Sequence, residues 1–178
     1  MTRCRIVFAV LLLLLAGQMP CGSAAWAGPA AGDDAAGDKR PADSAGVVRA
    51  SLRPALLTAK PGETVEFEVS FQVQKGWHLY AHGDTAYYGI ELTGFEGSAL
   101  AGASIDYPPG KAGEFFGEPV QLLTGRQRIR VKAPVAATAA GGAHFLPLAL
   151  ELQACDDQAC LAPAKVALPL RLEVAGQH

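Results

Sequence analysis

The chain has 178 residues, a formal net charge of −2 at pH 7, and a composition that is 50% hydrophobic and 18% charged. This length is enough for one core of ordinary size and too short for two comfortable domains. Lysine and arginine form no cluster along the sequence, which argues against nucleic acid as a partner.

The first 27 residues have the order of a secretory signal peptide. Arg3 and Arg5 precede an apolar run over residues 6–16, and small residues follow as far as Ala27. As a helix this run would rise only about 16 Å, roughly half of the hydrocarbon thickness of a bilayer. We therefore expect cleavage near Ala27, export, and a mature chain that carries a net charge of about −4 and does not insert into a membrane.

Residues 28–46 contain no β-branched or aromatic residue, so we expect a flexible leader there and one folded domain over residues 47–176. From Val47 onward, short runs alternate between apolar and polar residues and are separated by proline and glycine. This pattern favours an all-β protein with a β-sandwich fold.

The clearest predicted strand covers residues 63–73, where valine or phenylalanine occupies every second position. A Lys-Gly turn signal follows and leads into a second predicted strand at 77–81, and we expect these two strands to form a hairpin. Farther on, Ile129 and Val131 alternate with arginine and lysine. That alternation predicts a half-buried strand with a cationic, solvated outer face.

The last two predicted strands place the two cysteines that remain after cleavage. Apolar residues at alternate positions of 146–152 and of 166–174 are both expected to face the core. Continuing the first row with the same period gives Cys155 the opposite parity, so we expect Cys155 to be peripheral. Cys160 lies on the same polar connection, which places both thiols at the rim of the sandwich.

Two cysteines five positions apart on one loop reach disulfide distance if the loop folds back, and an exported chain meets an oxidising compartment. A structural disulfide is the commoner fate of such a pair. However, closing a loop of about six residues stabilises a fold by only about 2 kcal/mol in the chain-entropy model. Strained, exposed disulfides are the reducible ones, so a redox role and a structural role both stay open at this point.

Five short segments occur in a distinctive order, although none of them is specific by itself: Pro61-Gly62-Glu63-Thr64-Val65, Gly76-Trp77-His78-Leu79-Tyr80, Tyr107-Pro108-Pro109, Glu114-Phe115-Phe116-Gly117, and the segment from Cys155 through Cys160 to Pro163. Over about residues 52–174 the chain resembles the N-terminal periplasmic domain of the thiol:disulfide interchange protein DsbD. The resemblance implies an immunoglobulin-like β-sandwich in the periplasm, with no cofactor or metal. It also implies that the cysteine pair takes electrons from a membrane-embedded thiol donor and passes them to periplasmic thioredoxin-like oxidoreductases, as in cytochrome c biogenesis.

The same resemblance implies roles for the cysteines and for a cap. Cys160 would form the mixed disulfide with partners, and Cys155 would resolve it. Phe115, flanked by Glu114 and Phe116, would cover the pair until a partner displaces it. Because neighbouring side chains on a strand alternate between faces, only one of the two phenylalanines is expected to point inward.

Two further residues, His78 and Tyr80, match positions that line the cysteine pair in the family. We hypothesise that a charged His78 assists the thiolate and that Tyr80 donates a hydrogen bond to sulfur. Acidic side chains at Glu114, Asp156 and Asp157 would oppose the thiolate.

Three features depart from the family pattern. The cysteines have four intervening residues where well-known members have five, and Gly113 stands where an acidic residue adjoins the cap. The sequence also shows no membrane segment after the signal peptide and no thioredoxin-like domain. We therefore expect the electron donor to lie on another polypeptide.

Two alternatives remain from the residues alone. One is a non-catalytic interaction domain in which the disulfide is structural. The other is a copper- or zinc-binding module that uses His78, His82, Cys155 and Cys160. The two histidines would lie about 13 Å apart along a strand, too far to share one ion without a bend.

Overall fold

The computed structural model describes residues 40–100 and 102–176, which contain eleven strands and one short 3-10 helix, η1 (Ser44–Val47). The strands are β1 (Val48–Arg53), β2 (Leu56–Ala59), β3 (Thr64–Val73), β4 (Leu79–Tyr80), β5 (Glu91–Thr93), β6 (Ser104–Asp106), β7 (Lys111–Phe115), β8 (Glu118–Leu123), β9 (Arg126–Pro134), β10 (Gly142–Leu152) and β11 (Ala164–Val174). The expected signal peptide and residues 28–39 of the expected leader lie outside the described residues. Within the described ranges, no helix has the length and apolar character needed to cross a bilayer.

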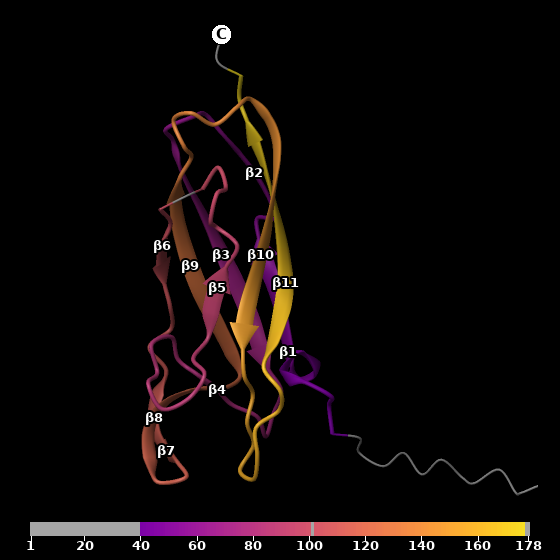
Figure 1. Cartoon of the computed structure of the whole chain (residues 1–178), viewed down its shortest axis with the longest axis vertical. Helices are drawn as coiled ribbons and strands as arrows, with labels where there is room; N and C mark the ends of the chain where they lie inside the picture. The colour runs from indigo at the N-terminus through magenta and orange to yellow at the C-terminus, as the bar shows by residue number, and fades with distance from the viewer. Residues whose placement is uncertain (1–39, 101, 177–178) are drawn as a thin grey trace, which may run out of the picture. The chain divides into compact units, whose positions relative to one another are not determined.

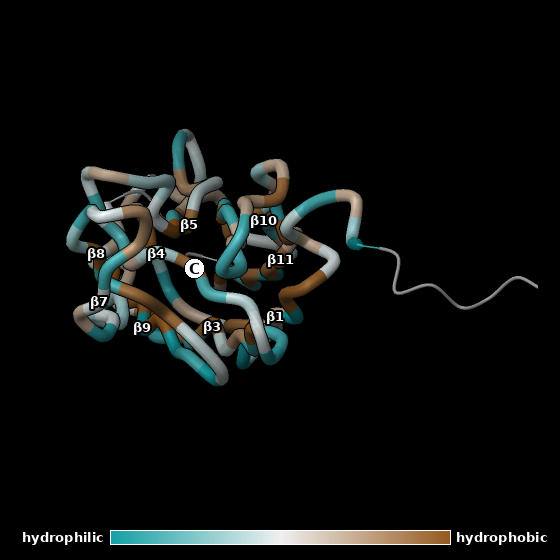
Figure 2. Tube along the Cα trace, turned by 90° about the horizontal axis from the view of Figure 1, so that it is seen from below, coloured by the Kyte–Doolittle hydropathy of each residue, from teal (hydrophilic) through white to brown (hydrophobic). Residues whose placement is uncertain are grey.

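Two four-stranded sheets make the sandwich, one in the order β1-β3-β9-β6 and the other in the order β2-β11-β10-β5. Seen end-on in Figure 2, β1, β3 and β9 lie on one side and β5, β10 and β11 on the other. The chain changes sheet between β1 and β2, which only two residues separate. This arrangement is the all-β, immunoglobulin-like sandwich that the sequence predicted.

The alternating rows predicted from the sequence form the core between these sheets. In β3 every second residue from Val65 to Val73 is buried, and in β10 the same holds from Leu146 to Leu152. The basic residues of β9 point outward. Lys132 and Arg128 pair there with Glu66 and Glu68 of β3, and Arg130 pairs with Asp106 of β6. Strand period and burial therefore agree along both sheets.

The expected hairpin between residues 63–73 and 77–81 is wrong. Strand β3 pairs with β1 on one edge and with β9 on the other, so neither edge is free to accept the next segment. The residues after the Lys-Gly turn instead form β4, which pairs with β8. Strands β4, β8 and β7 make a separate three-stranded sheet, and its β7–β8 turn lies near the β10–β11 connection at the end opposite the C-terminus (Figure 1).

The folded part of the chain begins earlier than residue 47. Asp43 forms a parallel bridge with Ala162, and its side chain caps η1 by accepting a hydrogen bond from the Ala45 amide. Residues 40–46, expected to belong to the flexible leader, are therefore held against the domain. Their small polar side chains bind main-chain groups instead of burying apolar surface, which composition alone does not reveal.

Candidate functional site

Cys155 and Cys160 form a disulfide at the start of the β10–β11 connection, with their Cα atoms 3.9 Å apart. Two main-chain hydrogen bonds bracket the pair, from the Asp156 amide to the Ala159 carbonyl (3.0 Å) and from the Leu161 amide to the Ala154 carbonyl (2.8 Å). We call residues 154–162 the cysteine hairpin. The two cysteines are thus held opposite each other by the backbone as well as by the bond between their sulfurs.

Asp156 closes the tip of the cysteine hairpin. Its Oδ1 atom accepts hydrogen bonds from the amides of Gln158 (2.9 Å) and Ala159 (2.8 Å). These two bonds are the main reason why the pKa of the Asp156 carboxyl is lowered, with a smaller contribution from the Arg40 guanidinium. Asp156 is therefore ionised at neutral pH and fixed in place.

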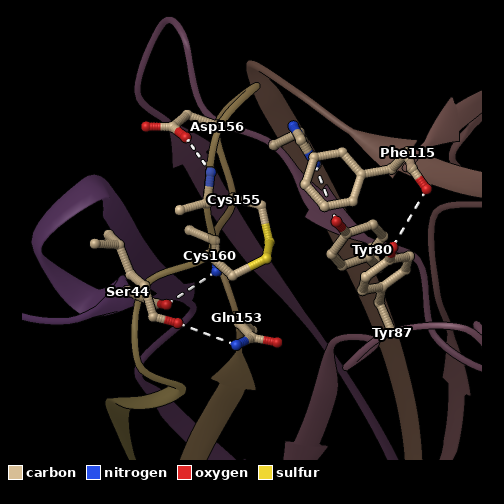
Figure 3. Close-up of a disulfide and its surroundings, with 12 residues drawn as sticks. Ser44, Tyr80, Tyr87, Phe115, Gln153, Cys155, Asp156 and Cys160 are labelled. Carbon is tan, nitrogen blue, oxygen red and sulfur yellow. Dashed lines mark hydrogen bonds between the residues drawn. A yellow bond between two sulfur atoms is a disulfide. The ribbon is translucent and has the colours of Figure 1, made fainter.

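Cys155 is 0% exposed, and Cys160 is half-buried. The expectation that Cys155 is peripheral is therefore wrong, although the parity argument placed it correctly outside the leucine row, which ends with buried Ala154. Cys155 instead belongs to a second apolar cluster, separate from the sandwich core, which also contains Tyr80, Phe115 and Val120. The pair does lie at the end of the sandwich, but this cluster covers it (Figure 3).

His78 reaches the cysteine hairpin through its main chain, because it forms a two-way bridge with Cys155. Its imidazole is 8% exposed and lies 3.2 Å from the Tyr80 hydroxyl through Nε2. Burial lowers the pKa of His78 and outweighs the opposing attraction of Asp157 and Asp156. The imidazole is thus held toward its neutral form, which weakens the hypothesis that a charged His78 assists the thiolate.

Tyr80 is completely buried, and its ring stacks on Tyr87 with centroids 4.6 Å apart. Burial raises the pKa of Tyr80 well above its ordinary value, and Tyr87 and Asp84 add to the effect. Its hydroxyl therefore stays protonated and forms a hydrogen bond with the Nε2 atom of His78. The contact with sulfur that was hypothesised for Tyr80 is replaced in this geometry by the bond to His78.

Phe115 ends β7 and Phe116 begins its two-residue turn into β8. Only Phe115 is buried, as expected, and the exposed ring of Phe116 lies beside it with centroids 4.4 Å apart. Phe115 is 7% exposed, and its ring meets those of His78 (5.0 Å) and Tyr87 (5.2 Å) edge to face. Phe116 is 69% exposed and has φ = +48°, a left-handed backbone that bulky residues rarely adopt. Phe115 therefore belongs to the buried cluster that contains Cys155, whereas Glu114 is exposed.

A side chain at the position of Gly113 would press against Leu122 of the neighbouring strand. A Cβ atom placed there would lie 2.8 Å from Cδ1 of Leu122, in the strand paired with it. An acidic side chain at this position would require Leu122 to move. No carboxylate of β7 therefore approaches the disulfide from Gly113.

His82 lies apart from the cysteine hairpin. Its ring stacks on Tyr107 with centroids 4.0 Å apart, and its Nδ1 atom lies 3.1 Å from the Ile90 carbonyl oxygen. Across residues 40–100 and 102–176, no three histidine, cysteine or acidic side chains gather in an arrangement that holds a metal ion. The alternative of a metal centre at His78, His82 and the cysteines gains no support from this geometry.

Sequence reasoning missed three residues that contact the site. The Tyr87 hydroxyl donates to the Phe115 carbonyl (3.2 Å), Ser44 binds the two ends of the cysteine hairpin, and Arg40 pairs with Asp156. Tyr87 follows Asp84 by three positions in a turn-rich loop, a spacing in which Asp84 accepts a hydrogen bond from the Tyr87 amide. Ser44 and Arg40 carry no comparable signal, since each lies 110 or more positions from the hairpin residues that it binds.

Comparison with known proteins identifies one matching family and several similar solved structures. The family described as "Thiol:disulfide interchange protein DsbD, N-terminal" matches residues 51–171. The N-terminal periplasmic domain of ScsB from Proteus mirabilis is 15% identical, with a TM-score of 0.49; the match covers 71% of this chain and 45% of that one. The N-terminal domain of DsbD from Neisseria meningitidis, in the reduced form, is 22% identical with a TM-score of 0.42, over 75% of this chain and 90% of that one. No curated protein sequence matches significantly.

Proposed function

This chain belongs to the family of N-terminal domains of the thiol:disulfide interchange protein DsbD, and on that premise we propose that it is a periplasmic thiol-disulfide exchange protein whose working group is Cys155 and Cys160. Residues 1–27 direct its export. The observation that carries the proposal is the disulfide inside the matched region, which closes over only six residues at the end of the sandwich and packs in a cluster with Phe115.

Exchange follows from the unequal burial of the two sulfurs. Cys160 is half-buried and Cys155 fully buried, so a partner reaches Cys160 first. In the reduced protein, the Cys160 thiolate attacks the disulfide of an oxidised thioredoxin-like partner and forms a mixed disulfide. Cys155, as thiolate, then attacks the Cys160 sulfur and releases the partner as a dithiol. Two electrons leave the pair, and Cys155 and Cys160 are again joined.

The return half of the cycle needs a dithiol donor. We place this donor on a membrane-embedded protein, whose dithiol becomes a disulfide while the S–S bond between Cys155 and Cys160 opens. In the oxidised state Phe115 lies over the pair and its main chain is held by Tyr87. Such a cap limits reaction with small oxidants and unrelated thiols, and a partner gains access only by displacing it.

Trapping in the periplasm tests the proposal. Cys155→Ala leaves Cys160 without its resolving partner, so mixed disulfides with thioredoxin-like proteins should accumulate and disappear on reduction. Cys160→Ala is the matched control and should trap far less, because the remaining thiol is buried. Absence of any trapped partner, together with a wild-type disulfide that thioredoxin-like reductants open only after unfolding, would contradict the proposal.

A structural disulfide in a non-catalytic interaction domain is the second candidate, favoured by the complete burial of Cys155. It predicts a bond that resists reductants in the folded state. It also predicts that replacing both cysteines costs about 2 kcal/mol, the value for a loop of this size. Denaturant unfolding of the Cys155→Ala, Cys160→Ala double variant, with the reduction assay on the wild type, separates the two candidates.

A further inference from the structure

Residues 40–46 lie along the cysteine hairpin and contact it at both ends and at its tip. We call them the strap. In Figure 3, Ser44 of the strap and the aromatic cluster of Tyr80 and Phe115 lie on opposite sides of the hairpin. The disulfide is therefore enclosed by two structures of different kinds, an apolar cap on one side and a polar strap on the other.

Ser44 joins the two ends of the cysteine hairpin. It is 0% exposed, its Oγ atom donates to the Ala162 carbonyl (2.7 Å), and the same atom accepts from the Ala154 amide (2.9 Å). The Ser44 amide also donates to the Ala162 carbonyl (3.0 Å). One buried side chain thus links Ala154, the residue before Cys155, to Ala162, two residues after Cys160.

Arg40 holds the tip of the hairpin. Its guanidinium lies 3.1 Å from Oδ2 of Asp156, donates to the Ala159 carbonyl (3.2 Å) and sits 5.1 Å from the centre of the Trp77 ring. The ion pair is exposed, and such pairs contribute little to global stability. Because Asp156 also binds the amides of Gln158 and Ala159, Arg40 braces a tip that is already ordered.

None of these contacts involves the sulfur atoms, so opening the disulfide breaks none of them directly. A reduced hairpin held in this way keeps its two thiols opposite each other, which favours closure over a freely moving loop. We propose that the strap is a positioning element that sets the redox equilibrium of Cys155 and Cys160 through the contacts of Arg40 and Ser44. This inference rests on the proposed exchange function.

The direction in which an Arg40 variant shifts the redox equilibrium depends on which redox state gains more conformational freedom. Loss of Arg40 loosens the reduced hairpin, whose ring is open, more than the oxidised one, whose ring is covalently closed. The reduced form gains conformational freedom and becomes more populated. The disulfide of an Arg40 variant is therefore easier to reduce than that of the wild type.

Titration against dithiothreitol measures this equilibrium. Dithiothreitol loses two electrons and two protons and closes to its cyclic disulfide, while the protein disulfide becomes two thiols. We expect Arg40→Gln to lower the equilibrium constant for closing the protein disulfide by about threefold to tenfold, where tenfold corresponds to about 30 mV. Arg40→Lys keeps the charge and should stay nearer to the wild type. Arg130→Gln is the matched control. It loses an ion pair with Asp106 in the sheet that does not contain β10 and β11, and it should not change the constant.

Thermal unfolding of the same oxidised variants should agree with the wild type, because only exposed contacts are lost. An Arg40→Gln constant equal to that of the wild type overturns the role of the strap while exchange itself stands. A shift of equal size in Arg130→Gln also overturns it, because the loss of one positive charge anywhere on the domain would then explain the change in the equilibrium constant. A wild-type disulfide that stays closed in excess reduced dithiothreitol until the protein unfolds overturns the exchange function instead.

Discussion

The main chains of His78 and Cys155 are hydrogen-bonded to each other in both directions, with N···O distances of 3.0 Å. This bridge attaches the start of the cysteine hairpin to the segment that leads into β4. It also brings the imidazole of His78, and with it Tyr80, into the cluster that covers the disulfide. The buried cysteine is thus fixed by backbone pairing, and the aromatic cover above it is the part that side-chain changes can loosen.

Removing the Tyr87 hydroxyl should loosen the cap. Tyr87→Phe keeps the ring that stacks on Tyr80 but loses the hydrogen bond to the Phe115 carbonyl. We expect reduction of the folded protein by dithiothreitol to become several times faster, with stability lowered by only about 1 kcal/mol. Tyr88→Phe is the matched control, because that hydroxyl binds Glu151 instead. Equal rates of reduction in the two variants would argue against a role of the Tyr87 hydroxyl in holding Phe115 in place.

Removing the Phe115 ring should uncover the disulfide. Phe115→Ala takes away its contacts with His78, Tyr80 and Tyr87. We expect reduction by dithiothreitol to be at least about tenfold faster, equivalent to about 1.4 kcal/mol of capping free energy. The free energy of unfolding should fall by about 3 kcal/mol.

Phe116→Ala is the control for the cap, since Phe116 is adjacent but exposed. It should leave the rate of reduction unchanged. If Phe116→Ala accelerated reduction as much as Phe115→Ala, the cover would not depend on the buried ring. Phe116→Gly should instead stabilise the domain by about 0.5–1 kcal/mol, because glycine adopts the positive φ of this turn without a steric cost.

His78 should make stability depend on pH. Its pKa is lowered in the folded protein from 6.5, mainly by burial, so below pH 6.5 the unfolded chain takes up the proton first. Stability from this residue is complete above pH 6.5 and is lost as the pH falls toward the folded pKa, with a slope of at most about 1.4 kcal/mol per pH unit.

Urea unfolding of the wild type and of His78→Phe between about pH 5 and pH 8 measures this contribution. The variant should lose part of the decline on the acid side. Exchange rates over the same range test whether the imidazole also acts on the cysteines. An identical pH profile for the two proteins would remove His78 from both roles.

Ser44→Ala should destabilise the domain. The substitution leaves the buried Ala154 amide without its acceptor, and one unsatisfied buried group costs about 1–3 kcal/mol. Ser70→Ala is the control, because Ser70 bonds only to Glu68 on an outer face. We expect a clear fall in the urea midpoint for the first variant and a much smaller one for the second.

The alternation of apolar residues in β3, β9, β10 and β11 was sufficient to predict the sandwich, because every second side chain of a half-buried strand must face the core. The same reasoning indicated that only one of Phe115 and Phe116 is buried. Pairing partners were less accessible. The sequence order of β3 and β4 suggested a hairpin, but β1 and β9 pair with the two edges of β3. A local sequence pattern does not show which distant strand pairs with a given edge.

The sequence by itself determined the fold class, the position of both cysteines on one connection between strands, and the family that the chain resembles. Only the tertiary structure decided that Cys155 is covered, that burial holds His78 toward its neutral form, and that Arg40 and Ser44 reach the hairpin. Parity fixes which face of a strand a side chain takes, whereas its burial depends on what else packs there. Here the covering residues come from β4, β7 and the strap, which only chain folding brings to the two sulfurs.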